Sequence, residues 1–313
     1  MKIPVLLPNI FDHPFTYSSN LNLNVGDYVL VPFGKSKMIG VVWDELEKVK
    51  KKNFVTKKII KKLNIPPLNL KTLNFLNWFS EYNLISKGMC LKLHMLSNQP
   101  LEQLKVSEFE SYKKSSKIQR YVLSEEQEKA LNSINNIKNK FRVHLLQGTT
   151  GSGKTIVYFN SIKNIVKKNQ QALILLPEIG LTSEFQKKFK DFFGFESAVW
   201  HSGISKKNKA IIWSGLAGGD IKVVIGARSA LFLPFKKLGI IIVDEEHDQS
   251  FKQDEGIIYN ARDMAIARAK YENIPINLVT AIPSLETYEN VKKGKYYHSR
   301  LIKRYKNAML PQH

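Results

Sequence analysis

The stretch that decides the fold is GTTGSGKT at residues 148–155. It fits the pattern G-x-x-x-x-G-K-[ST], in which glycines let the backbone turn its N–H groups toward phosphate oxygens, where a side chain would clash. The run FRVHLL (141–146) predicts a strand before it, and residues 156–167 predict a helix whose N-terminus faces the phosphates. We expect the nucleotide to be held by Gly148, Thr149, Thr150, Gly151, Ser152, Gly153, Lys154 and Thr155.

A second stretch, DEEH at residues 244–247, follows the apolar run GIIIV (239–243). We predict that Lys154 contacts the β and γ phosphates of ATP, and that Thr155 and Asp244 hold Mg²⁺. Glu245 would orient the attacking water, so Lys154, Asp244 and Glu245 are the candidate catalytic residues. A glycine-rich turn that binds nothing is the alternative, and the strand, the helix and the acidic strand end around it argue against that.

The charge of the chain indicates a polyanionic partner. A length of 313 residues allows two or three domains, and the formal net charge is +21. Such a charge favours binding to phosphates, although the many Asn and Ile residues also indicate a drift toward AT-rich codons that raises the Lys content. The lysine-rich segment from Lys48 to Lys62 is either a solvated loop or a strip that follows phosphates.

Several other classes of protein are disfavoured by the sequence. No run approaches the ~18 apolar residues of a membrane span, and the prolines and Asp12 near the N-terminus are unlike a signal peptide. Cys90 is the single cysteine, which excludes an internal disulfide and a cysteine-rich zinc site. We expect a cytoplasmic protein without zinc.

The N-terminal part changes character along its length. Residues 1–65 are predicted to be β-rich, with strands at 28–33 and 38–43 joined by the hairpin loop GKSK (34–37). Residues 66–98 are predicted to be helical, because Phe75, Trp78, Phe79 and Tyr82 repeat at the spacing of one helix face, most simply a core face. Residues 99–120 have the composition of a linker.

From residue 121 to 313 strands and helices alternate. Apolar runs of strand length lie at 141–146, 172–176, 221–225, 239–243 and 276–279. This order predicts an α/β fold with a parallel sheet covered on both faces, in which 148–155 and 244–247 lie at the carboxyl ends of strands. We therefore expect a RecA-like P-loop lobe behind a small β-rich domain and a helical segment.

Further segments make the chain resemble the PriA family (primosomal protein N′), superfamily 2 DNA helicases that restart stalled bacterial replication forks. The segments are LSEEQ (123–127), LLPEIGLT (175–182), WHSGIS (200–205), IGARSALFLPF (225–235) and DEEHDQSFKQDEGIIYNARD (244–263). The resemblance implies an ATP- and Mg²⁺-dependent 3′-to-5′ helicase that works with forked DNA and primosome proteins.

The resemblance also implies roles for residues of the lobe. Gln127 would read the adenine edge, although its alternative is an ordinary polar helix position. Arg228 would contact the DNA backbone, or else serve as a structural ion-pair partner. Phe251 and Lys252 resemble a loop that couples DNA occupancy to hydrolysis, where Phe251 either stacks on a base or packs under the loop. The implied coupling residues are His247 and Thr280.

In the N-terminal part, FTY (15–17) and GDYVLVPFGKSK (26–37) resemble the family's module for the 3′ end of a DNA strand. The resemblance implies a pocket made by Thr16, Tyr17, Gly34 and Lys35, with Tyr17 stacked on the terminal base. Some members carry an acidic residue where Thr16 stands, so the preference for a 3′ hydroxyl would be weaker here. An ordinary strand is the alternative for 15–17.

The chain also departs from the family pattern. It ends at His313, after one lobe, and TAI at 280–282 stands where helicases usually have SAT. The second lobe, the winged-helix domain and the zinc-binding cysteines lie outside it. We expect a helicase part whose second lobe comes from another chain, a platform for forks and nucleotide that does not unwind, or a decaying fragment, with little helicase activity in isolation. A P-loop ATPase acting on a substrate other than nucleic acid is the alternative from another class.

Overall fold

The computed structural model describes residues 1–44, 56–95, 106–112, 121–136 and 140–303. The chain forms two compact units. The first contains Met1–Glu108 together with Ile204–Gly218 and Phe232–Lys236, and the second contains the remaining residues. The domain boundaries predicted at residues 65, 98 and 120 divide the chain into continuous segments. The first unit is instead discontinuous, because it includes two stretches from later in the sequence.

The first unit is built on an antiparallel sheet of order β2-β1-β4-β3-β5. The predicted strand at 28–33 is confirmed as β3, but β4 begins at Ser36, so the hairpin turn contains Gly34 and Lys35 alone. Residues 48–55 of the predicted lysine-rich segment (48–62) lie outside the described residues. The elements are β1 (Lys2–Leu6), β2 (Phe15–Ser18), β3 (Tyr28–Phe33), β4 (Ser36–Val42), β5 (Lys61–Lys62), α1 (Leu70–Asn83), α2 (Lys87–His94) and α6 (Lys206–Gly218).

The predicted helical segment is confirmed as α1 and α2. Helix α1 begins after Asn69, whose side chain accepts a hydrogen bond from the Thr72 backbone N–H at 2.8 Å. Its aromatic stripe is only partly core, because Phe75 and Phe79 are fully buried while Tyr82 is 64% exposed. The predicted linker is outside the described residues except for the 3₁₀ helix η1 (Val106–Tyr112).

The second unit contains a sheet of seven parallel strands among the described residues, in the order β14-β6-β13-β10-β7-β9-β8. The predicted parallel sheet is confirmed, and the strands the sequence did not reveal are β8 and β14 at its two edges. The strands are β6 (Arg142–Gly148), β7 (Gln171–Leu175), β8 (Ala198–Trp200), β9 (Val223–Gly226), β10 (Leu238–Asp244), β13 (Pro275–Thr280) and β14 (Tyr297–Leu301).

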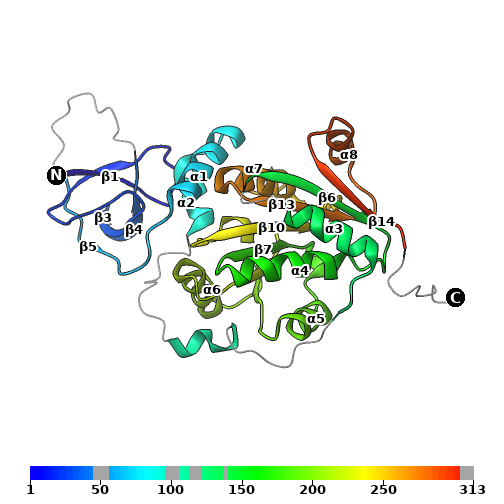
Figure 1. Ribbon diagram of the computed structural model, residues 1–313. Coiled ribbons are helices and arrows are strands. Elements are labelled where there is room, and N and C mark those ends of the chain that lie inside the picture. The colour runs from blue at the N-terminus through cyan, green and yellow to red at the C-terminus, as the bar shows by residue number, and fades with distance from the viewer. Residues whose placement is uncertain (45–55, 96–105, 113–120, 137–139, 304–313) are drawn as a thin grey trace. The chain divides into compact units, whose positions relative to one another are not determined.

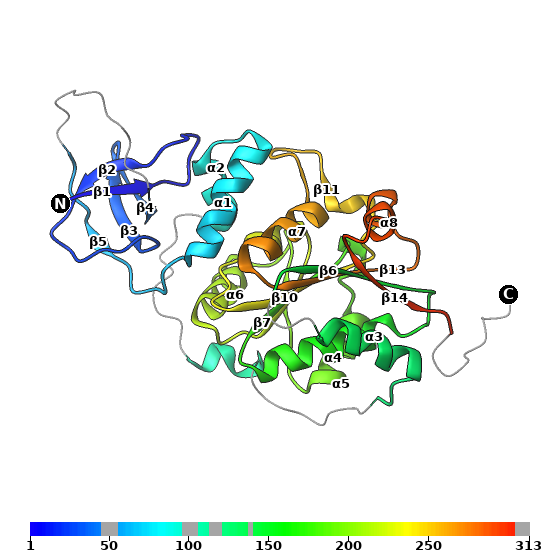
Figure 2. The same cartoon turned by 45° about the horizontal axis from the view of Figure 1, so that its top comes forward.

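Helices cover both faces of this sheet (Figures 1 and 2). On one face, Phe159 of α4 packs against a group of aromatic rings from α5, with ring centroids 5.3–5.8 Å away. Helix α7 packs on β10 and β13 from the other face. The other elements are α3 (Glu125–Asn135), α4 (Lys154–Lys167), η2 (Glu178–Gly180), α5 (Ser183–Phe193), η3 (Arg228–Phe232), η4 (Gln249–Phe251), β11 (Lys252–Gln253), β12 (Tyr259–Asn260), α7 (Ala261–Glu272) and α8 (Leu285–Lys292).

Three neighbouring strands of this sheet end together. In the parallel register Gln147 of β6 lies opposite Thr280 of β13, and Asp244 of β10 lies opposite Val279. The loop that follows Gly148, the acidic turn and Thr280 are therefore at one edge, where open parallel sheets bind ligands. Among the described residues, no helix combines the length and the apolar character that crossing a bilayer requires.

The buried His144 of β6 makes the stability of this unit depend on pH. Its Nε2 lies 3.1 Å from Ser299 Oγ, and burial lowers its pKa from 6.5 to about 4. The unfolded chain therefore binds a proton that the folded chain does not, so stability is full above pH 6.5 and falls toward pH 4. The shift corresponds to a loss of about 3 kcal/mol by pH 4.

Urea titrations at pH 7 and pH 5 test this expectation. The free energy of unfolding is expected to fall with pH more steeply for the unmodified chain than for His144→Gln, which lacks the titrating group. The same pH dependence in the two proteins would assign the effect to other groups.

Candidate functional site

The strand, loop and helix predicted around residues 148–155 are confirmed as β6, the segment 149–153 and α4. Gly151 and Gly153 both have φ of +82°, a left-handed conformation that residues with a Cβ rarely adopt. A Cβ on Gly148 would lie 2.5 Å from Ser152 Oγ, so the loop also needs a glycine there for close packing. The glycines of the pattern are thus explained by backbone geometry.

Lys154, the first residue of α4, lies over this loop with 9% of its surface exposed. Its Nζ donates to the Gly148 carbonyl at 2.7 Å and more weakly to the Thr149 carbonyl at 3.5 Å. Asp244 is reached from the same helix, because Tyr158, one turn after Lys154 on α4, donates to its Oδ2 at 2.8 Å. The cation and the acid that the sequence singled out thus belong to two elements that are in contact.

Asp244, the last residue of β10, is buried and has a fixed orientation. Its Oδ2 accepts a hydrogen bond from Tyr158 Oη at 2.8 Å, and its Oδ1 accepts one from the Glu245 backbone N–H at 3.1 Å. Burial raises its pKa to about 6, against the opposing effects of Tyr158 and Lys154. Tyr158 was not predicted, and the signal that could have found it is its position four residues after Lys154 on α4.

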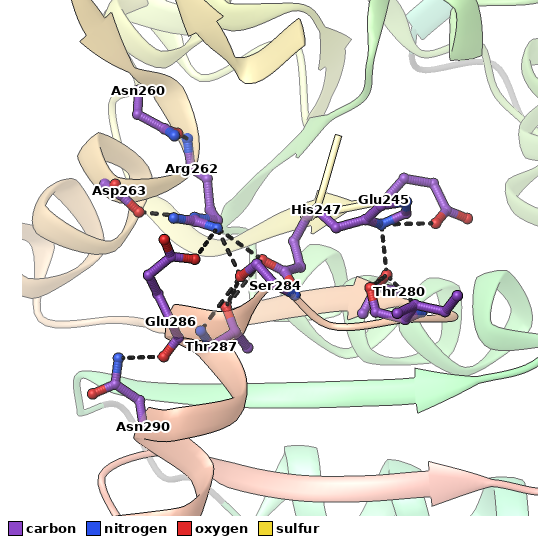
Figure 3. Close-up of polar contacts among 12 residues, drawn as sticks. Glu245, His247, Asn260, Arg262, Asp263, Thr280, Ser284, Glu286, Thr287 and Asn290 are labelled. Carbon is purple, nitrogen blue, oxygen red and sulfur yellow. Dashed lines mark hydrogen bonds and ion pairs between the residues drawn. The ribbon is translucent and has the colours of Figure 1, made fainter. Parts of the chain in front are cut away.

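The acidic turn after β10 is strained and connected to the end of β13. Glu245 has φ of +49°, and its side chain is 44% exposed. The His247 Nδ1 lies 2.8 Å from Thr280 Oγ1, and 3.7 Å from Glu245 Oε2 (Figure 3). Thr280 Oγ1 donates its own proton to the Ile282 carbonyl, so His247 Nδ1 is the donor in their bond. The two predicted coupling residues are thus in contact, and their coupling role stays a prediction.

Gln127 is adjacent to the loop but is not open to solvent. It is 1% exposed, its Nε2 donates to the Ser152 carbonyl at 2.9 Å, and its Oε1 accepts from the Ser124 backbone N–H at 3.0 Å. Both ends of the amide are thus used by the protein, in a capping box at the start of α3 and in a bond to the loop. Reading adenine with the second N–H and the second lone pair of the amide would require the buried side chain to become accessible.

The hairpin of β11 and β12 corrects one expectation about DNA contacts. Phe251 is 1% exposed, so it packs under its loop and is not placed to stack on a base. Lys252 is exposed, with its Nζ 3.1 Å from Asp254 Oδ1. Arg228 Nη1 donates to the Lys252 carbonyl at 2.8 Å, which makes Arg228 at least in part a support of the hairpin backbone.

Comparisons with known proteins identify the family of the chain. Residues 4–96 match a PriA family model described as the 3'DNA-binding domain (3'BD), and residues 120–285 match one described as type III restriction enzyme, res subunit. The chain is 40% identical over 309 residues to the replication restart protein PriA of Rickettsia conorii, covering 98% of this chain and 47% of that protein. The chain belongs to the PriA family.

Other relatives and solved structures are more distant. The chain is 31% identical to PriA of Haemophilus influenzae, over 100% of this chain and 53% of that protein. It therefore spans about half the length of these curated PriA relatives. A structure of RecG bound to a three-way DNA junction has a TM-score of 0.45 and 24% identity, covering 62% of this chain and 25% of that one.

In the unit that contains the PriA 3'BD match, the four predicted pocket residues differ in accessibility. Lys35 is exposed at the β3–β4 turn beside Gly34, which has φ of +59° and open space where a Cβ would lie. Thr16 of β2 is half-buried opposite Pro4 of β1. Tyr17 is 4% exposed and its Oη donates to the Pro32 carbonyl at 3.2 Å. Its ring belongs to the core of the sheet, which argues against the predicted stacking on a base.

Proposed function

We propose that this chain is the part of an ATP-dependent 3′-to-5′ DNA helicase of replication restart that binds ATP, Mg²⁺ and the 3′ end of forked DNA. The observation that carries the proposal is that helix α4, which begins with Lys154, is hydrogen-bonded through Tyr158 to Asp244 at the carboxyl end of β10. The loop beside them has Gly151 and Gly153 in left-handed conformations. The PriA relatives support the choice of DNA as the substrate and replication restart as the setting.

The residues around the loop fit a nucleotide. Ser152 Oγ is buried and has no hydrogen-bond partner in the part of the chain that the structure describes. Lys154 Nζ would exchange its carbonyl partners for phosphate oxygens, with backbone N–H groups of 149–153 around them. Thr155 and Asp244 provide the hydroxyl and the carboxylate that Mg²⁺ prefers. When bound, Mg²⁺ neutralises the charge that develops on the phosphoryl oxygens.

The other side chains of the site would orient the attacking water and hold the acidic turn in place. Glu245, half-exposed after Asp244, would accept a proton from the attacking water and orient it. Tyr158 holds Asp244 Oδ2, which fixes the carboxylate before metal and nucleotide arrive. His247 and Thr280 join the acidic turn to the end of β13, so movement at either end reaches the other.

DNA binding would involve both units. In the first, Lys35 is an exposed cation at the hairpin turn, and Lys57 Nζ donates to the Gly34 carbonyl at 3.4 Å. In the second, Lys252 is exposed at the β11–β12 hairpin that Arg228 supports. The net charge of +21 favours phosphate binding that weakens with salt. Primosome proteins and a separate chain with the second lobe are further partners in this proposal.

The test is ATP hydrolysis by the purified chain with and without a forked DNA that has a 3′ hydroxyl at the branch. Affinity for that fork is measured alongside, by fluorescence anisotropy at several salt concentrations, with the same fork ending in a 3′ phosphate as the control. We expect hydrolysis to be stimulated by the fork and the hydroxyl end to be preferred.

Retained nucleotide and fork binding without hydrolysis would instead support a platform that does not unwind. Absence of fork binding even at low salt would contradict the proposal and favour an ATPase acting on another substrate.

A further inference from the structure

Glu246, the second glutamate of DEEH, has no part in the roles above, yet it is 1% exposed. Its Oε1 accepts a hydrogen bond from the Ser284 backbone N–H at 2.7 Å. Its Oε2 accepts from Ser284 Oγ and Thr287 Oγ1, both at 3.0 Å, and from Arg262 Nη1 at 3.3 Å. A buried carboxylate is costly unless it is paired and hydrogen-bonded, and here both oxygens are satisfied. The position of Glu246 is therefore tightly specified.

Arg262 connects this carboxylate to the hairpin. Figure 3 shows its guanidinium between Asp263 and the pair Ser284 and Thr287. Arg262 Nε donates to Asp263 Oδ1 at 2.8 Å, and Nη1 donates to Ser284 Oγ at 2.8 Å. The Arg262 backbone N–H donates to Asn260 Oδ1 at 3.0 Å, and Asn260 is both the last residue of β12 and the N-cap of α7. One buried pair thus joins the acidic turn, the start of α8 and the end of the β11–β12 hairpin.

The neighbouring Glu245 needs such an anchor. A non-glycine residue in the left-handed region costs about 1–3 kcal/mol and persists only where its surroundings hold it. The Glu246 backbone N–H donates to the Val279 carbonyl at 3.1 Å, so Glu246 is held by its main chain as well as by its side chain. With Asp244 fixed on the other side by Tyr158, Glu245 lies between two restrained residues.

We propose that Glu246 and Arg262 are positioning residues, whose buried pair holds Glu245 in its strained conformation and makes the rate of ATP hydrolysis depend on DNA contact at the β11–β12 hairpin. The proposal rests on the proposed function. Among the contacts described above, neither Glu246 nor Arg262 makes a hydrogen bond to the loop around Lys154. A positioning role for the pair therefore predicts that nucleotide affinity is unchanged when the pair is altered, whereas a general structural role would also weaken nucleotide binding.

The experiment compares Glu246→Gln and Arg262→Lys in the full chain with the control Glu286→Gln. Glu286 is a matched control, because its carboxylate lies 3.8 Å from the same guanidinium but its side chain is 72% exposed. Affinity for a fluorescent ATP analogue is measured first, and then kcat and KM with and without forked DNA. Circular dichroism checks that each variant is folded. If Glu246→Gln does not fold, Arg262→Lys is used to test the proposal.

We expect Glu246→Gln to lower the DNA-stimulated kcat by about 10²-fold, the scale of a small misplacement of a catalytic group, with KM and nucleotide affinity unchanged. Stimulation by DNA should be largely lost. Arg262→Lys, which keeps the charge but not the planar fork, should lose less, and Glu286→Gln should behave as the unmodified chain. An unchanged kcat in Glu246→Gln, an equal loss in Glu286→Gln, or a loss confined to nucleotide affinity would overturn the proposal.

Hydrogen exchange separates this proposal from the proposed function, because it needs no hydrolysis. We expect Glu246→Gln to speed amide exchange at 245–248 and at 259–263 together, with no change in Glu286→Gln. Faster exchange at 245–248 alone would overturn the link to the hairpin, whether or not the unmodified chain hydrolyses ATP. Failure of the unmodified chain to bind nucleotide would instead count against the proposed function.

Discussion

Replacing Lys154 with alanine is expected to lower the kcat of ATP hydrolysis by at least about 10²–10³-fold, the cost of removing one preorganised group that stabilises transition-state charge. Lys154 is the buried cation at the head of α4, and its ammonium already lies at the loop that would hold the phosphates. Alanine leaves the loop glycines and Asp244 unchanged. The fall in kcat should therefore not be explained by unfolding of the variant.

The control for this prediction is Lys167→Ala, which removes the same side chain from the exposed last turn of the same helix. Phosphate release is measured for both variants at saturating ATP, with and without forked DNA. If the two variants hydrolyse ATP equally well, Lys154 does not act on the phosphates and the proposed site is wrong.

Replacing Asp244 with asparagine is expected to move activity and stability in opposite directions. Hydrolysis should fall by about 10²–10³-fold, because the carboxylate that would bind the metal is lost. Stability should rise, because burial raises the pKa of Asp244 to about 6 and its ionised form is disfavoured in the folded chain. For a carboxyl with a raised pKa, stability is lost as pH rises from the unfolded value of 3.8 through 6, so the gain is present at pH 8.

The gain is bounded at about 3 kcal/mol by the size of that pKa shift. Both hydrogen bonds can be kept, because the asparagine oxygen can accept from the Glu245 backbone N–H while its amide N–H donates to Tyr158 Oη. Urea titrations at pH 8 and at pH 4 measure it, and the difference between the two proteins should nearly vanish at pH 4, where the unmodified side chain is protonated. A variant that is less stable at pH 8 would show that the charge of Asp244 contributes to folding.

The parts of the fold that the sequence predicted are those where chemistry dictates the residue. The loop at 148–155 requires glycine for its backbone, and β10 is buried on both faces, so it reads as an uninterrupted apolar run. The edge strands were missed because an edge strand is shorter or more accessible to solvent and need not be a long apolar run. Strand β14 has the sequence YHSRL, with four of its five residues at least partly accessible, and β8 has three residues. Strand β14 lacks the apolar run that identifies a central strand, and the apolar run AVW of β8 is too short to do so.

In the candidate sites, the residues that belong to a fixed motif were predicted better than those chosen by residue type. Lys154 and Asp244 belong to patterns that fix the position of their side chains, whereas Tyr17 and Phe251 were chosen for an aromatic character that suits a base as well as a core. Residue type alone does not tell which face of a strand or loop is buried, and the structure buries both rings. Tyr158 was missed because its role depends on a contact with a strand far along the sequence.

The hydrogen bond from Lys154 Nζ to the Gly148 carbonyl bears on how quickly a nucleotide can leave. A phosphate that takes this ammonium displaces an internal partner at 2.7 Å, and the same carbonyl is ready to take it back when the phosphate departs. Binding is then an exchange of partners, and the net free energy is the difference between two bonded arrangements. If the chain hydrolyses ATP as proposed, ADP and phosphate must leave after every cycle, and we expect the Gly148 carbonyl, which competes for Lys154, to shorten the lifetime of the product complex.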